Sequence, residues 1–116
     1  MAGIEPVTIP TLHAALAAGR PADDAVSGVT ADSLGASRLG DIAYAVAARA
    51  GVRSLLVSDD DIIAARKRLW EQYRLAAEHG GVTALAALIA GAYQPAEGER
   101  VAVVICGANT DPATLA

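Results

Sequence analysis

The stretch Val52-Arg-Ser-Leu-Leu-Val57, followed at once by Ser58-Asp-Asp-Asp61, decides the fold class. The first part is a short apolar run typical of a β-strand. The second part is typical of a helix start, because a Ser or Asp cap and further acidic residues complement the free N–H groups found there. A strand that leads directly into a helix predicts an α/β arrangement.

The helix that begins at this cap is expected to be the longest in the chain and to end around residues 78–81. At helical spacing, one apolar face of it is formed by Ile62, Leu69, Tyr73 and Ala76, with Trp70 at the edge. Arg66, Lys67 and Arg68 follow one turn after the acidic start. The sequence therefore predicts an amphipathic helix packed against the sheet.

Further elements are expected on both sides of this unit. The pattern predicts a strand over residues 2–6, a helix capped by Thr8 and stopped by Gly19, a helix over 39–50, a buried helix over 82–93, a strand over 101–105, and a helix start at 109–112. Residues 21–35 show no strong period and are expected to be an irregular connection. The fold class is thus α/β, a partial parallel sheet with flanking helices, in a single partial domain spanning residues 1–116.

The sheet is expected to be incomplete. Val101-Ala-Val-Val-Ile105 is a continuous, mostly β-branched run, which is the pattern of a parallel strand buried on both faces. Such a strand needs neighbours on both edges, and three short strands form a poor sheet by themselves. We therefore expect that the chain lacks strands around which its sheet is built.

Composition excludes several classes of function. The net charge of −4, the pI near 4.9 and the 3% aromatic content argue against a nucleic-acid partner. No apolar run approaches the roughly 20 residues that cross a bilayer, so no membrane span is expected. A single cysteine and an N-terminus without the pattern of a signal peptide favour a cytoplasmic location.

The first candidate site is the segment Cys106-Gly107-Ala108-Asn109, which follows the last predicted strand. Open parallel sheets bind ligands at the carboxyl ends of their strands, and a glycine lets a ligand or a neighbouring chain approach closely. The thiol could hydrogen-bond a ring nitrogen or act as a nucleophile. The alternative is that Cys106 is a small buried apolar residue.

The second candidate site is Glu78-His79-Gly80-Gly81, which precedes the buried helix. A helix N-terminus and two glycines suit a bound anion, and a carboxylate beside an apolar helix could do acid–base work. The alternative is a solvated glutamate next to a two-glycine hinge. His13 and His79 do not combine with Cys106 into a metal spacing, so no metal site is expected.

Lys67 is the only lysine, so any Schiff base formed by this chain would have to use it. At about 100° per residue it points away from the apolar face of its helix. It is expected to lie at the surface and to pair with Glu71 one turn later.

Several segments together resemble the C-terminal part of the serine/threonine dehydratases. The resemblance rests on Val57-Ser-Asp-Asp-Asp-Ile-Ile-Ala-Ala-Arg66, on Leu69-Trp70-Glu71, on Glu78 and Gly80 before an alanine-rich helix, and on Val103-Val-Ile-Cys106-Gly-Ala-Asn109-Thr-Asp111, in that order. Gly3-Ile-Glu5-Pro6 and the segment 13–19 resemble what precedes them in that family. These enzymes use pyridoxal phosphate (PLP), and the resemblance implies the C-terminal part of the large domain of a fold-type-II enzyme.

The resemblance also implies roles for individual residues. Cys106 matches the serine or cysteine that hydrogen-bonds the pyridine nitrogen of PLP, and Glu78 matches an acidic residue near the ring. Gly107 and Asn109 match the turn that shapes this side of the pocket. The turn Ala31-Asp32-Ser33 is similar to one that passes near cofactor and substrate.

Two departures from the family pattern limit what can be carried over. The residue after Glu78 is His79, where proline is common. Glu5 matches the first ligand of a cation site found in part of the family, but Thr11 stands where a later acidic ligand would be, so no metal is inferred.

The implied function is that of a C-terminal fragment of a PLP-dependent dehydratase, a lyase that deaminates L-threonine or L-serine to a 2-oxo acid and ammonia. By resemblance, the Schiff-base lysine and the phosphate-binding loop lie N-terminal to the matched region, so no catalytic residue is expected in this chain and the fragment should be inactive alone. The expected partners are a complementary N-terminal chain or further copies in an oligomer, with an amino acid as substrate of the complete enzyme. The alternatives are a non-catalytic α/β interaction module and a small-molecule binder that uses the Cys106 loop.

Overall fold

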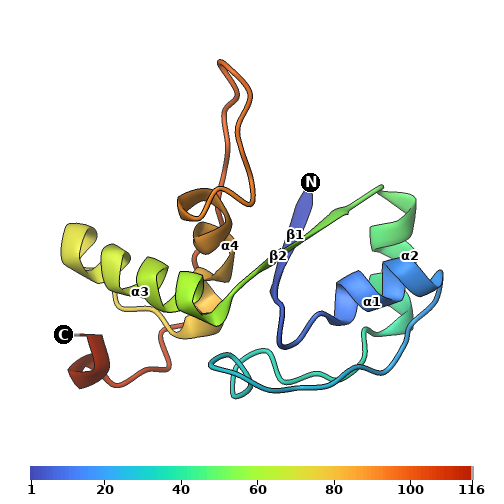
Figure 1. Cartoon of the computed structure of the whole chain (residues 1–116), viewed down its shortest axis with the longest axis horizontal. Coiled ribbons are helices and arrows are strands. Elements are labelled where there is room, and N and C mark those ends of the chain that lie inside the picture. Colours follow the sequence, from blue (N-terminus) through green and yellow to red (C-terminus); the bar gives the residue numbers. More distant parts are fainter. Residues whose placement is uncertain (116) are drawn as a thin grey trace.

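A computed structural model describes residues 1–115 of the chain. Two parallel strands, β1 (Ala2–Pro6) and β2 (Arg53–Val57), pair in register from Ala2 opposite Arg53 to Pro6 opposite Val57. Figure 1 shows helices flanking this narrow sheet on both sides. The predicted α/β class, with a parallel sheet and flanking helices, is confirmed.

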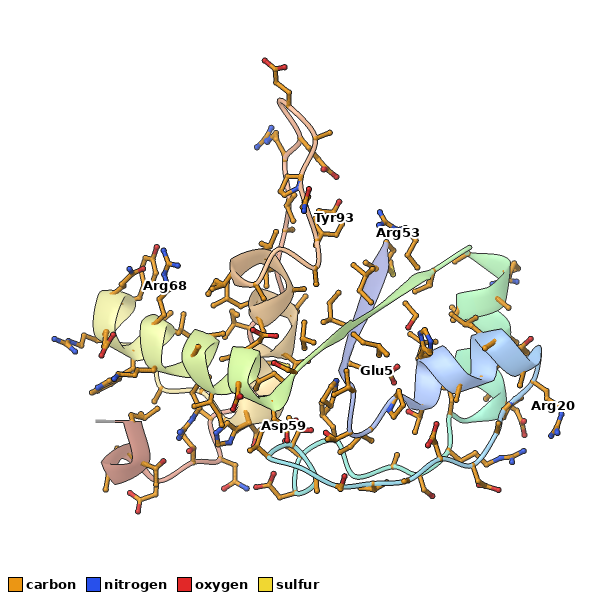
Figure 2. All side chains as sticks on the ribbon, in the orientation of Figure 1. Glu5, Arg20, Arg53, Asp59, Arg68 and Tyr93 are labelled. Atoms are coloured by element: carbon orange, nitrogen blue, oxygen red, sulfur yellow. The ribbon has the colours of Figure 1, made fainter. Side chains whose placement is uncertain are left out.

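The helices α1 (Thr11–Ala18) and α2 (Asp41–Arg49) lie together beyond one side of the sheet. The predicted cap of α1 at Thr8 is wrong, because the Thr8 hydroxyl donates instead to Asp59 at 3.0 Å. The carboxylate of Glu5 caps α1 from the neighbouring strand, and it accepts the N–H groups of Leu12 at 2.7 Å and His13 at 2.9 Å. Figure 2 shows Glu5 beside the start of α1.

The helix α3 (Asp59–Tyr73) begins as the sequence predicts. Ser58 and Asp61 form a capping box, in which the Ser58 hydroxyl accepts the Asp61 N–H and the Asp61 carboxylate accepts the Ser58 N–H, both at 3.1 Å. The helix ends earlier than predicted, because Arg74 adopts a left-handed conformation with φ 56°. The chain then runs to Glu78 without helix, so Ala76 lies outside α3 and Tyr73 is exposed.

The helix α4 (His79–Ile89) begins earlier and ends earlier than the predicted range 82–93. It packs on α3 and also contacts both strands. The core between these elements is small and consists of Val57, Ile62, Ala65, Leu69, Ala77, Val82, Ala86 and Ala87. Because the core side of α4 is largely alanine, α4 can pack closely against α3 and the sheet.

The predicted strand over residues 101–105 does not form a ladder in the described residues. The segment forms neither helix nor strand, and Val101, Val104 and Ile105 are exposed, Val104 to 72%. A strand is defined by its hydrogen-bonding neighbours, and no described segment pairs with this one. The prediction of a buried strand was therefore wrong for the chain as described.

The last described element is a short 3₁₀ helix, η1 (Pro112–Leu115). Asp111 supplies its cap, because its carboxylate accepts the Ala113 N–H at 2.9 Å. The helix start was predicted over 109–112 with proline in the first turn, and Pro112 is indeed its first residue. No helix within residues 1–115 is long and apolar enough to span a bilayer.

Candidate functional site

The two segments singled out from the sequence lie against each other. The Glu78 N–H donates to the Gly107 carbonyl at 3.0 Å, and the Cys106 N–H donates to the Gly81 carbonyl at 3.3 Å. These two backbone bonds fix the loop after residue 105 to the N-terminal turn of α4. The structure thus brings Glu78, Cys106 and Gly107 into one site.

Close packing at this junction requires glycine at two positions. A Cβ atom on Gly81 would overlap the carbonyl oxygen of Cys106. Gly107 has a left-handed φ of 74°, and a Cβ on it would overlap the Glu78 carboxylate. The Glu78 side chain therefore lies directly over the backbone of Gly107.

The turn Ala31-Asp32-Ser33 completes the site on a third side. Ser33 packs against Gly80, where a Cβ would lie 2.5 Å from the Ser33 hydroxyl oxygen. The turn therefore lies at the N-terminus of α4, close to the segment that carries Glu78. Sequence reasoning missed the residue that holds the turn's loop in place, which is Asp59.

Asp59 ties the irregular connection to the start of α3. Its carboxylate accepts the Thr8 hydroxyl and the Val29 N–H, each at 3.0 Å. Figure 2 shows Asp59 at the start of α3, beside the loop that passes beneath the sheet. In the sequence, the acidic run 59–61 indicates only the start of a helix. Nothing in it shows that Asp59 also accepts hydrogen bonds from Thr8 and Val29.

Cys106 is exposed, which contradicts the alternative that it is a buried apolar residue. Asn109 is also exposed, and none of the side-chain hydrogen bonds found within residues 1–115 involves it. The cluster therefore consists of Glu78, Cys106 and Gly107, with Asn109 two residues further along the loop. The exposed thiol can donate a hydrogen bond to a polar atom of a ligand or accept one from it.

Arg66 holds the segment that follows Cys106 in place through hydrogen bonds to Thr110 and Thr114. It was not identified as a site residue from the sequence. It is only 6% exposed, and its guanidinium donates to the carbonyls of Ala77 at 2.9 Å and Thr114 at 3.1 Å and to the Thr110 and Thr114 hydroxyls. The sequence did contain a signal, because Arg66 lies four residues after Ile62 and three before Leu69. A charged residue on the apolar face of a helix indicates a buried polar network.

Burial lowers the pKa of His79 below its ordinary value of 6.5, and the nearby positive charge of Arg66 lowers it further. The carboxylates of Asp32 and Asp59 oppose this shift without cancelling it. The imidazole at the start of α4 is therefore held neutral at neutral pH. A neutral side chain also suits this position, because a helix N-terminus disfavours a cation.

Lys67 and Glu5 both have partners within the chain. Lys67 lies on the exposed face of α3 and pairs with Glu71 at 3.7 Å, as predicted. Glu5 caps α1 and also accepts the Thr11 hydroxyl at 3.1 Å, so its carboxylate is already engaged. The described residues contain no group of three or more His, Cys, Asp or Glu side chains that could hold a metal ion.

Comparisons with known proteins found a matching family and several relatives. The family described as "Pyridoxal-phosphate dependent enzyme" matches residues 1–107. Phenylserine dehydratase from Ralstonia pickettii is 38% identical over 114 residues, which cover 98% of this chain and 35% of that protein. Biosynthetic L-threonine dehydratase from Haemophilus influenzae is 34% identical over 114 residues, 97% of this chain and 22% of that protein.

Solved structures give the same result for the fold. Maize serine racemase superposes with a TM-score of 0.83 at 28% identity, covering 98% of this chain and 36% of that one. The threonine deaminase of T.th. superposes with a TM-score of 0.82 at 26% identity, covering 95% of this chain and 39% of that one. The chain therefore spans only about a third of the length of most of these proteins.

Proposed function

The chain belongs to the pyridoxal-phosphate-dependent enzyme family, and from this premise we propose that it forms the C-terminal part of a serine/threonine dehydratase and supplies one wall of its cofactor site. The names of the relatives support this substrate class, because phenylserine, threonine and serine are all β-hydroxy amino acids. The proposed reaction of the complete enzyme removes the α proton and the β hydroxyl and yields a 2-oxo acid and ammonia.

The observation that carries the proposal is the exposed Cys106, whose loop is fixed by two backbone hydrogen bonds to the turn that carries Glu78. This arrangement suits a ligand with an aromatic nitrogen, since the exposed thiol can hydrogen-bond a ring nitrogen and the Glu78 carboxylate lies over the backbone of Gly107. When bound, PLP supplies an electron sink for the carbanion left by proton removal. Cys106 would orient the ring, and Glu78 would place a carboxylate near its edge.

The chain alone is proposed to be inactive. A lysine that forms a Schiff base must be partly desolvated so that its amine loses its proton. Lys67 does not meet this requirement, since its side chain is 64% exposed and paired with Glu71. The reactive amine and the phosphate-binding loop would come from a complementary N-terminal polypeptide, in a cytoplasmic assembly that could also be an oligomer.

The direct test is native mass spectrometry of the protein drawn from its own cell extract, with PLP present. We expect it to co-purify with a second polypeptide and one cofactor for each pair. Recovery of the chain alone, or as an oligomer of itself without PLP, would rule out the enzyme interpretation. A measurable rate of L-threonine deamination by the pure chain would contradict the proposed inactivity.

The role of Cys106 is tested in the same assembly. Cys106→Ser keeps a hydrogen-bonding group and should retain PLP absorbance and activity, whereas Cys106→Ala should weaken PLP binding by at least tenfold. Arg68→Ala, at an exposed position of α3, is the matched control. Equal PLP affinity of the Ser and Ala variants would exclude contact between the thiol and the ring.

The alternative function is a non-catalytic interaction module. A specific feature favours it, namely the exposed apolar side chains of Val101, Val104 and Ile105. A module of this kind would bind a partner protein without PLP, so the cofactor content of the purified assembly separates the two functions.

A further inference from the structure

The buried side chain of Arg66 joins the two segments that carry the candidate site residues. Its guanidinium donates to the Ala77 carbonyl at 2.9 Å and to the Thr110 hydroxyl. Ala77 directly precedes Glu78, and Thr110 lies four residues after Cys106. One side chain of α3 therefore holds both segments from the same point.

Backbone hydrogen bonds connect the same two segments a second time. The Glu78 N–H donates to the Gly107 carbonyl at 3.0 Å, and the Thr110 N–H donates to the Ala108 carbonyl at 2.8 Å. With the two bonds from Arg66 they form a closed circuit of four hydrogen bonds, the Arg66 network. Because each bond of a closed circuit limits the movements that would break the others, the loss of one should loosen both segments.

Packing alone would favour an apolar side chain at position 66. Arg66 is buried on α3 together with Ile62 and Leu69. The hydrogen bonds of its guanidinium go to carbonyls and hydroxyls and not to a carboxylate. A buried charge without a counter-charge costs free energy that its hydrogen bonds only partly offset. What the planar guanidinium adds is direction, because its rigid donors fix where the acceptors lie.

We propose that Arg66 is a positioning residue of the cofactor site, which acts through the Arg66 network to hold the Cys106 loop in place. This inference rests on the proposed function. Arg66 uses its donors within the chain and would not need to touch the cofactor. Its effect would pass through Cys106, because a hydrogen bond from the thiol to a ring nitrogen weakens steeply when its distance or angle changes.

Amide hydrogen exchange on the chain alone, measured residue by residue by NMR, tests the network. Thr110→Val removes the hydroxyl that closes the circuit, and it leaves Arg66 in place. We expect exchange at the N–H groups of Glu78 and Cys106 to become about fivefold faster, the factor that corresponds to one lost hydrogen bond. The N–H of Val7, which bonds to the Val57 carbonyl, should change little.

Thr11→Val is the matched control. The Thr11 hydroxyl also donates to another segment, since it bonds to the Glu5 carboxylate at 3.1 Å, but it lies on α1 and outside the Arg66 network. The same chemical change should therefore leave exchange at Glu78 and Cys106 unaltered. Equal acceleration at these two N–H groups in Thr110→Val and Thr11→Val would overturn the proposal.

The affinity for PLP tests whether the network acts on the site. It is measured by PLP absorbance in the assembly with the complementary polypeptide. Thr110→Val should weaken PLP binding about threefold or more, whereas Thr11→Val should not. Added to Cys106→Ala, Thr110→Val should have little further effect, because a residue that acts through the thiol has no effect once the thiol is removed. Fully additive losses would overturn the positioning role.

The outcomes also separate this inference from the proposed function. Equal PLP affinity of Thr110→Val and Thr11→Val would leave the proposed function standing and overturn the positioning role. Faster exchange at Glu78 and Cys106 in a chain whose assembly binds no PLP would support control of the loop by the Arg66 network and count against the proposed function. Equal acceleration at Val7 and at the two site N–H groups would show a general loss of stability and overturn the inference.

Discussion

At the scale of single residues, Arg66 contributes most to the geometry of the site. Its guanidinium is buried and uses its donors on Ala77, Thr110 and Thr114, which lie on both sides of the loop that carries Cys106. Its partners are carbonyls and hydroxyls rather than a carboxylate. Arg66 therefore acts by positioning the loop, through a planar fork of donors that lysine cannot reproduce.

We expect Arg66→Met to lower the free energy of unfolding by about 3 kcal/mol, because buried carbonyls and hydroxyls would lose their donor. Arg68→Met, at an exposed position of the same helix, should change it by less than about 0.5 kcal/mol. Urea unfolding followed by circular dichroism measures both. Equal stabilities of the two variants would show that the Arg66 network contributes nothing.

The lowered pKa of His79 predicts how the stability of the fold depends on pH. Burial and Arg66 lower its pKa in the folded state, so the unfolded state binds more protons as the pH falls through 6.5. The contribution of His79 to stability is therefore present above that pH and is lost below it. Urea unfolding at pH 7.5 and pH 5.5 should show a larger loss for the natural chain than for His79→Gln. An identical loss in both would assign the effect to other groups.

At the scale of elements, the local sequence predicts the first residue of a helix better than it predicts the last. The start of α3 was predicted correctly because Ser58 and Asp61 form a capping box that depends only on neighbouring residues. Its end was predicted too late, because a left-handed Arg74 stops the helix where glycine would be expected. The cap of α1 was missed for a different reason, since Glu5 reaches it from another element.

The capping box gives a prediction for α3. Ser58→Ala removes the acceptor for the Asp61 N–H and should destabilise the fold by about 1 kcal/mol. Ser37→Ala, on the exposed irregular connection, should leave stability nearly unchanged. Thermal unfolding of both variants measures the difference. A loss shared equally by the two would mean that the cap does not stabilise α3.

At the scale of the whole molecule, the sequence was sufficient for the fold class, whereas the two backbone hydrogen bonds that join the Glu78 and Cys106 segments are seen only in the structure. The prediction of a buried strand at residues 101–105 was wrong, because a β-branched run favours a strand but does not say which segment pairs with it, and no described segment does. Arg66 was missed because its partners Thr110 and Thr114 lie more than forty residues away in the chain. These two features were therefore missed because both depend on contacts between distant segments.

The exposed apolar side chains predict how the isolated chain behaves. Four large apolar residues are at least half exposed, namely Val104 in the segment 101–105, Ile42 and Val46 on α2, and Tyr73 on α3. This much exposed apolar surface favours association of chains. The small alanine-rich core contributes little to the free energy of unfolding. We expect the isolated chain either to self-associate or to have a free energy of unfolding below about 5 kcal/mol, the lower end for natural domains.

Sedimentation at several protein concentrations, combined with thermal unfolding, tests this expectation. A self-associating chain should show a midpoint that rises with its concentration, because association stabilises the folded state by mass action. A partner polypeptide that covers Val104 should raise the midpoint further and reduce self-association. A monomer that unfolds sharply and independently of concentration would show that the sheet is complete without a partner, and it would remove the physical reason for expecting one.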